Sequence, residues 1–178
     1  MDDKELIKSI GSGDKSALRE LYLRYNGPIY AFLMSRCNNA ELCSDCVQDT
    51  MLNVIRSASQ FSGKASVKTW LFTIARNKLV DALRKRGRLT LVEEFPEHED
   101  SAPNPEAAAV AAQERDRLRS CIDKLSDTHR VAIRLAFFEE LTYPEIAEIE
   151  DVPVGTIKTR IFHAKQALMK CLEKGMQP

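Results

Sequence analysis

Apolar residues recur at every third or fourth position along nearly the whole of this 178-residue chain. This spacing lines one side of an α-helix, whereas a half-buried strand requires apolar and polar residues to alternate, and no stretch sustains that alternation. Hydrophobic residues make up 44% of the chain and charged residues 29%, a balance that is typical of a globular protein. The sequence therefore predicts an all-α protein.

Three helices are predicted in the first half of the chain. Asp14 can cap the first, and Pro28 marks a kink or a break within it. The second helix places four apolar residues on one side, namely Cys43, Val47, Met51 and Val54. The third begins near Val67 and turns inward Leu71, Ala75, Leu79 and Ala82. Its predicted outward face comprises Thr69, Thr73, Arg76, Asn77 and Arg84.

The formal net charge is zero, but the charges are segregated along the chain. Residues 57–88 hold eight basic side chains against the single acidic Asp81, and residues 89–113 hold six acidic side chains and no Lys or Arg. The acidic stretch also contains Pro96, Pro103 and Pro105, which is typical of a flexible linker. We predict two small helical domains, residues 1–88 and 113–178, joined by a flexible acidic linker over residues 89–112.

The C-terminal part of the chain predicts a helix-turn-helix. Thr142 and Glu145 form a capping box at the start of a short acidic helix, residues 150–152 are the turn, and Pro153 suits the first turn of the next helix. That last helix is basic and rich in hydroxyl groups, so only it can approach phosphates at low electrostatic cost. This is the geometry of a recognition helix in a major groove, although an amphipathic hairpin with a solvated basic face is the alternative.

These segments resemble the extracytoplasmic-function (ECF) sigma factors of the sigma-70 superfamily. Residues 141–168 resemble region 4 of that family, and Asp45-Cys-Val-Gln-Asp49 resembles the region 2 helix that grips the polymerase clamp. Residues 61–86, including Thr69-Trp-Leu-Phe-Thr-Ile-Ala-Arg-Asn77, resemble the part that reads and opens the minus-10 element. The resemblance covers residues 13–88 and 113–172, and the order of the two regions makes it specific.

The resemblance implies a protein that binds core RNA polymerase at its clamp and flap and directs transcription initiation at promoter DNA. Contact with the clamp would be made by Asp45, Gln48 and Asp49. The melted minus-10 element would be held by Gly63, Lys64, Ser66, Arg76, Asn77, Lys78, Arg84, Lys85 and Arg86. The minus-35 element would be read by Thr156, Lys158, Thr159, Arg160, His163 and Lys165. An anti-sigma factor is implied as a further partner, and neither catalytic residues nor cofactors are expected.

Two residues depart from the family pattern. Asp151 stands where the family often has a small turn residue, and Asp tolerates the left-handed conformation such a turn needs. Cys46 stands where the family usually has an apolar residue. Cys37, Cys43 and Cys46 could supply three zinc ligands, but no fourth ligand is evident nearby, and free cysteines are commonly buried. We therefore interpret Cys46 as a core residue, and stoichiometric zinc in the purified protein would contradict this.

Other functions are disfavoured by what the sequence contains. The chain has no apolar run long enough to span a bilayer and no signal peptide, so we expect a cytoplasmic protein, at the nucleoid when bound to polymerase and held at the membrane only through an anti-sigma factor. With five cysteines, an odd number, and no export signal, reduced thiols are expected. A stand-alone helix-turn-helix regulator would leave residues 13–88 unexplained, and a helical adaptor would leave the basic face from Arg76 to Arg86 merely solvated.

Overall fold

The computed structural model describes residues 1–87 and 107–174, and these residues form helices and no strand. The prediction of an all-α protein is confirmed. The predicted linker lies outside the described residues up to residue 106, after which a helix begins. In chain order the elements are α1 (Asp3–Gly11), α2 (Lys15–Arg36), α3 (Ala40–Ser57), the short η1 (Ala58–Gln60), α4 (Val67–Gly87), α5 (Ala107–Asp123), α6 (Asp127–Ile133), the π-helical η2 (Arg134–Phe138), α7 (Tyr143–Glu150) and α8 (Val154–Lys174).

Helices α2, α3 and α4 pack together, and their inner faces are largely those expected from the periodicity. The four predicted core residues of α3 are buried, and so are Leu71, Ala75 and Leu79 of α4. The rings of Phe32 and Phe72 meet with their centroids 5.2 Å apart at the centre of this core. Pro28 neither breaks nor ends α2, which runs through it to Arg36. The break that Pro28 suggested is therefore wrong, because the helix is held on both sides of the proline by buried residues.

Helix α1 was not predicted, although its sequence carries a clear start signal. Asp2 and Glu5 form a reciprocal capping box, in which each side chain accepts a hydrogen bond from the other residue's backbone N–H. The apolar residues Leu6, Ile7 and Ile10 are buried against the rest of the core. The helix is short, so its stability comes from this burial rather than from intrinsic propensity.

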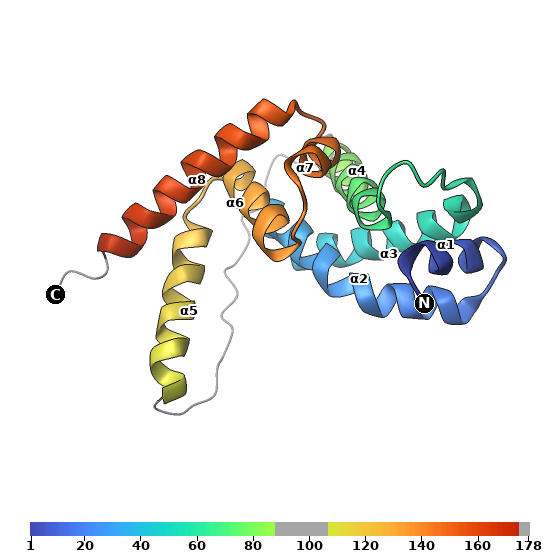
Figure 1. The fold of residues 1–178 in the computed structure, drawn as a ribbon, viewed down its shortest axis with the longest axis horizontal. Coiled ribbons are helices and arrows are strands. Elements are labelled where there is room, and N and C mark those ends of the chain that lie inside the picture. The colour runs from blue at the N-terminus through green and yellow to red at the C-terminus, as the bar shows by residue number, and fades with distance from the viewer. Residues whose placement is uncertain (88–106, 175–178) are drawn as a thin grey trace.

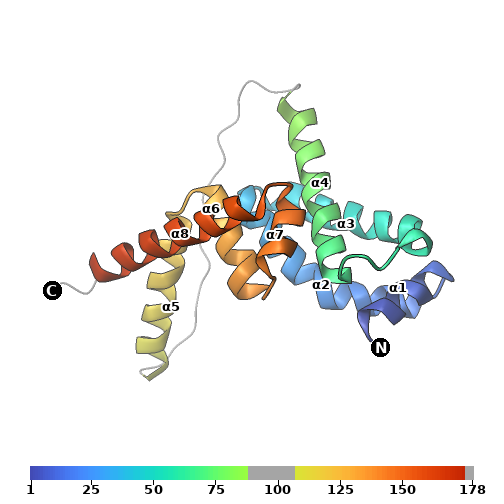
Figure 2. The same ribbon diagram turned by 45° about the horizontal axis from the view of Figure 1, so that its top comes forward.

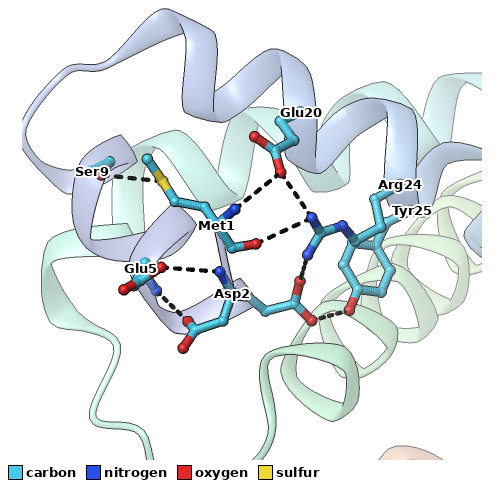
Figure 3. Close-up of polar contacts among 8 residues, drawn as sticks. Met1, Asp2, Glu5, Ser9, Glu20, Arg24 and Tyr25 are labelled. Atoms are coloured by element: carbon cyan, nitrogen blue, oxygen red, sulfur yellow. Dashed lines mark hydrogen bonds and ion pairs between the residues drawn. The ribbon is translucent and has the colours of Figure 1, made fainter.

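A polar cluster fixes α1 to α2 (Figure 3). The carboxylate of Asp3 accepts hydrogen bonds from the guanidinium of Arg24 and the hydroxyl of Tyr25, and Arg24 also pairs with Glu20 at 2.8 Å. Burial, together with the hydrogen bond to the Asp3 carboxylate, raises the pKa of Tyr25. The neutral phenol is therefore the stable form in the folded protein, and it acts as the donor in this cluster.

The second half of the chain packs directly on the first. Figure 1 shows α6 beside α2 and α7 beside α4, so that residues far apart in sequence share one core. Val131, Leu135, Ile146 and Ile157 belong to the same buried cluster as the residues of α2–α4. A smaller cluster of Leu125, Ile133 and Ala164 holds α6 to α8. The two helical domains therefore meet along an extensive interface.

Cys121 of α5 and Cys171 of α8 form a disulfide with their Cα atoms 5.8 Å apart. The expectation of reduced thiols is wrong for this pair. The two residues are separated by 50 positions, and only the packing of α5 against α8 brings them together. Cys37, Cys43 and Cys46 remain free thiols.

We expect Tyr25→Phe to lower the free energy of unfolding by about 1–2 kcal/mol, because it removes a buried donor to a charged acceptor. Tyr22→Phe is the matched control, since Tyr22 is exposed on the same helix. Urea unfolding followed by circular dichroism measures both variants. An equal effect of the two substitutions would show that the hydrogen bond to Asp3 does not stabilise the contact between α1 and α2.

We expect reduction of the disulfide to destabilise the second domain by about 2–4 kcal/mol, because the bond closes a long loop and so constrains the unfolded chain. Thermal unfolding with and without dithiothreitol measures this difference. A variant with Cys121→Ser and Cys171→Ser should match the reduced protein and show no response to the reductant. A wild-type protein that is equally insensitive would contradict the pairing.

Candidate nucleic-acid interface

The helix-turn-helix predicted from the sequence is present in α7 and α8. The carboxylate of Glu145 accepts hydrogen bonds from the backbone N–H and the hydroxyl of Thr142, at 2.9 and 2.7 Å. Asp151 ends α7 in the left-handed conformation with φ 56° and ψ 50°, as its side chain allows. Pro153 lies just before α8, and its carbonyl accepts a hydrogen bond from Thr156 N–H. The predicted capping box and turn are confirmed.

Helix α8 separates its core from its basic face. Ile157, Ile161 and Ala164 are buried, whereas Val154 is exposed at the start of the helix. Four of the predicted minus-35 residues are exposed on the opposite side, namely Lys158, Thr159, His163 and Lys165. Thr156 and Arg160 are only partly exposed. Lys165 also lies over the ring of Phe137, 4.9 Å from its centroid. The exposed strip of α8 is cationic and continuous with the end of the turn.

The second cationic surface lies at the C-terminal end of α4. Figure 2 shows this end projecting beyond α3 and α7. Arg84, Lys85 and Arg86 are exposed there, and nearer the middle of the helix Asn77 is exposed and Lys78 is partly exposed. At the other end of α4, Gly63 adopts a φ of 70° in the preceding loop and leaves Lys64 exposed. The loop and the projecting end are thus both accessible, but they are separated by the length of the helix.

Between those two ends, the face of α4 is covered by α7. Thr69 was expected to face solvent, but it is fully buried, which corrects that prediction. Its hydroxyl and that of Ser66 donate to the Glu145 carboxylate, each at 3.2 Å. Two of the nine predicted minus-10 residues therefore bond to the second domain, namely Ser66, which stays exposed, and Arg76, which is partly exposed.

The carboxylate of Glu145 joins the two domains. Burial opposes its ionisation, but hydrogen bonds from Thr142, Thr69 and Ser66 outweigh burial and lower its pKa. The same carboxylate thus serves as the reciprocal half of the capping box and as an acceptor for α4. Its ionised form stabilises both the start of α7 and the contact between the domains.

A second carboxylate, that of Glu150, contacts arginines from both domains. It accepts a hydrogen bond from Arg36 of α2, and its other oxygen lies 3.6 Å from the guanidinium of Arg160 in α8. The backbone carbonyl of Glu150 accepts a hydrogen bond of 3.2 Å from Arg76 of α4. Nearby, Glu139 forms an ion pair of 3.0 Å with Lys68, and its carbonyl accepts a bond from the same ammonium at 2.7 Å. Glu139 and Glu150 are both buried, and the paired cations offset the desolvation cost of their carboxylates.

The predicted polymerase-binding residues lie together on the outer face of α3. Asp45, Gln48 and Asp49 are all exposed, on the side opposite the buried cysteines and valines. The structure adds Leu52 and Ile55 to this face, with 49% and 46% of their surfaces exposed. Sequence reasoning missed them, although spacings of three and four from Gln48 and Asp49 onward place them on the same side. Apolar side chains exposed beside charged ones are typical of a protein-binding surface.

Two of the three free cysteines, Cys43 and Cys46, lie on the buried side of α3, and Cys37 caps the C-terminal end of α2. Cys46 is buried, as predicted for a core residue, and Cys43 donates from its thiol to the carbonyl of Cys37 at 3.4 Å. Burial raises the pKa of Cys43 to about 12 and also raises the pKa values of the other two thiols. Metal binding requires thiolates, which this environment disfavours. Among the described residues, no group of three or more His, Cys, Asp or Glu side chains could hold a metal ion.

The described residues define a DNA-binding class of protein, in which a helix-turn-helix is packed on a second helical domain and each carries a cationic surface. The family model for Sigma-70 region 2 matches residues 21–89, and that for Sigma-70 region 4 matches residues 115–168. The ECF RNA polymerase sigma factor RpoE of Cereibacter sphaeroides is 38% identical over 149 residues, covering 83% of this chain and 82% of that protein. The RNA polymerase sigma-H factor of Pseudomonas aeruginosa is 30% identical, covering 96% of this chain and 94% of its own.

The chain belongs to the ECF family of RNA polymerase sigma factors. The resemblance found in its motifs is thereby confirmed. It is a transcription initiation factor rather than an enzyme, and it binds core RNA polymerase and promoter DNA. No helix in residues 1–87 and 107–174 has the length and apolar character needed to cross a membrane.

Solved structures show the same fold. The sigma factor RpoE of Bartonella quintana, in complex with the anti-sigma factor NepR, is 26% identical with a TM-score of 0.66, covering 87% of this chain and 96% of that one. CnrH, in complex with the cytosolic domain of CnrY, is 24% identical with a TM-score of 0.67, covering 97% of both chains. Both structures thus share the fold of this chain over most of its length.

We expect Glu145→Gln to lower the free energy of unfolding at neutral pH by about 1 kcal/mol, since it weakens the capping box. Because the folded-state pKa of Glu145 is lowered, its contribution is present above the ordinary value of 4.5 and is lost as the pH falls through the folded-state value. The difference from wild type should therefore shrink below about pH 4.5. Glu148→Gln, on the exposed side of α7, should cost little at any pH, and urea unfolding across pH measures both.

Proposed function

We propose that the two domains divide promoter recognition between them. Residues 1–88 bind core polymerase and hold the opened minus-10 element, residues 113–178 read the minus-35 element, and residues 89–112 link them. The observation that carries this assignment is the presence of two separate cationic surfaces on α4 and α8, each on a helix whose other side is buried. Two basic surfaces on separate domains suit two contacts with one DNA molecule.

The minus-10 contact is assigned to Gly63, Lys64, Ser66, Arg76, Asn77, Lys78, Arg84, Lys85 and Arg86. Separating and unstacking base pairs costs a few kcal/mol per step, and a basic groove for the released strand can offset that cost. The projecting end of α4 offers three consecutive cations for this purpose. The exposed loop around Lys64 provides a second place where the single strand can be held.

The minus-35 contact is assigned to the outer face of α8, that is, to Thr156, Lys158, Thr159, Arg160, His163 and Lys165. Lys and Arg side chains suit phosphates and guanine edges, and Thr suits either base edges or phosphates. The contact with the polymerase clamp is assigned to Asp45, Gln48 and Asp49. We add Leu52 and Ile55 to that contact, because they would bury apolar surface that is now exposed to water.

We further propose control by an anti-sigma factor. The proposal is supported by the relatives of known structure, in which RpoE of Bartonella quintana is complexed with the anti-sigma factor NepR. We place the active protein in the cytoplasm, at the nucleoid when bound to polymerase. Release from an anti-sigma factor held at the membrane would then set its activity.

In vitro run-off transcription with purified core polymerase tests the proposed function. Genomic fragments upstream of candidate genes serve as templates, and the start sites are mapped from the RNA products. The protein should produce transcripts with defined 5′ ends that core polymerase alone does not make. Failure to start RNA at any defined site would overturn the proposed function.

We expect Arg84→Ala combined with Lys85→Ala to reduce promoter opening by at least tenfold, because two phosphate contacts are lost from the melted strand. Permanganate footprinting of unpaired thymines measures opening, and affinity for core polymerase should be unchanged. The matched control is Lys4→Ala with Lys8→Ala, which removes the same charge from exposed positions on α1. A loss of core binding in the α4 variant would contradict the assignment of these residues to DNA.

A further inference from the structure

His163, which the proposed function assigns to the minus-35 contact, touches two aromatic rings on the exposed side of α8. The imidazole of His129 in α6 stacks on it, with the ring centroids 6.4 Å apart and the ring planes at 30°. The ring of Phe162 meets it at an angle of 70°, with the centroids 5.4 Å apart. Aromatic rings attract one another at centroid separations of about 4.5–7 Å, in stacked and edge-to-face arrangements. The exposed imidazole of His163 therefore has a preferred orientation.

The two helices that carry the histidines are fixed against each other beside this contact. Ile133, one turn after His129, and Ala164, which follows His163, are both buried in the cluster that joins α6 to α8. Figure 1 shows α6 lying beside α8. Close packing of buried side chains leaves little room for one helix to shift along the other. His129 is therefore a support whose position is set by the core.

The two imidazoles contact each other without using their nitrogen atoms. Within residues 1–87 and 107–174, neither His129 nor His163 has a hydrogen-bond or ion-pair partner. A neutral imidazole has one nitrogen that donates a hydrogen bond and one that accepts. His163 can therefore offer a nitrogen to DNA while its ring stays stacked on His129.

The orientation of the His163 ring decides what it can recognise. His163 follows Thr156 and Thr159 at spacings of three and four along the outer side of α8. An imidazole that rotates freely would meet a phosphate oxygen as readily as a base, and a phosphate contact carries no sequence information. An imidazole held in one orientation can direct a nitrogen at a base edge, such as the N7 and O6 acceptors of guanine. Restricting the ring before binding also reduces the entropy lost on binding.

We propose that His129 is a positioning residue for minus-35 recognition. Its ring holds the His163 ring in the orientation that reads one base pair, so His129 affects specificity without contacting that base pair itself. The inference rests on the proposed minus-35 role of α8. It gives α6, which precedes the helix-turn-helix, a part in reading the promoter.

Nuclear magnetic resonance of the chain alone tests the contact between the rings. The chain has three histidines, so the imidazole signals can be assigned by single substitutions. His129→Ala should shift the signals of the His163 ring protons, because the ring current of His129 is lost. Thr128→Ala, at an exposed position in the same turn of α6, is the control and should leave those signals in place. Unchanged His163 signals in His129→Ala would overturn the proposal.

Run-off transcription with core polymerase tests the effect on specificity. The templates carry a promoter mapped with the wild-type chain, with each base pair of its minus-35 element substituted in turn. His163→Ala should abolish the preference at one base pair. His129→Ala should lower the preference at that same base pair by about fivefold, within the range that an aromatic pair contributes, and leave the other positions unchanged. His129→Phe should restore most of the preference, because it keeps a ring against His163.

Several results would contradict a positioning role. A uniform loss of transcription from all templates in His129→Ala would indicate that the residue only stabilises the domain. Equal defects in His129→Ala and His129→Phe would show that the ring is not what acts on His163. Additive losses in the double variant of His129→Ala and His163→Ala would show that the two residues act independently.

Failure of this inference can be distinguished from failure of the proposed function. A chain that starts no RNA at any defined site overturns the proposed function, and the role of His129 with it. Defined transcription with an unaltered minus-35 preference in His129→Ala refutes the role of His129 alone and leaves the proposed function standing.

Discussion

The burial of Glu139 and Glu150 is the constraint on which the relative placement of the two domains depends. An ionised carboxylate removed from water is unfavourable unless cations and hydrogen bonds replace its hydration. Here those cations come from α2 and α4 of the first domain and from within the second. Apolar burial between α6 and α2 stabilises the contact but does not fix its geometry, because the hydrophobic effect is non-directional. The paired charges instead fix the position of α7 along α4.

Much of the fold could be predicted because its determinants are local. The spacing of Cys43, Val47, Met51 and Val54 identifies the buried side of α3 without knowledge of its neighbours. The capping box of Thr142 and Glu145 and the tolerance of Asp151 for a positive φ depend on residues a few positions apart, and both are found in the structure. Family motifs then supplied functional roles that periodicity alone could not give, since a basic amphipathic helix has the same pattern whether or not it binds DNA.

What could not be predicted depends on contacts between distant parts of the chain. Thr69 has the helical position of an exposed residue, and only the arrival of α7 buries it. The same packing engages Ser66 and Arg76, so their place in the candidate site differs from that of Arg84–Arg86. The pairing of Cys121 with Cys171 likewise depends on α5 lying along α8. Charge patterns indicate which segments attract each other, but the partner of each acid is set by tertiary geometry.

The chain has a formal net charge of zero, and some of its acidic residues pair with basic residues across the contact between the domains. A protein with two exposed basic surfaces would bind any DNA through phosphate contacts alone, because that attraction is independent of sequence. In this chain the second domain brings its own carboxylates to the cations of the first. Arg36 and Lys68 are thereby held by Glu150 and Glu139, so fewer cations are open to phosphates than the number of basic residues suggests.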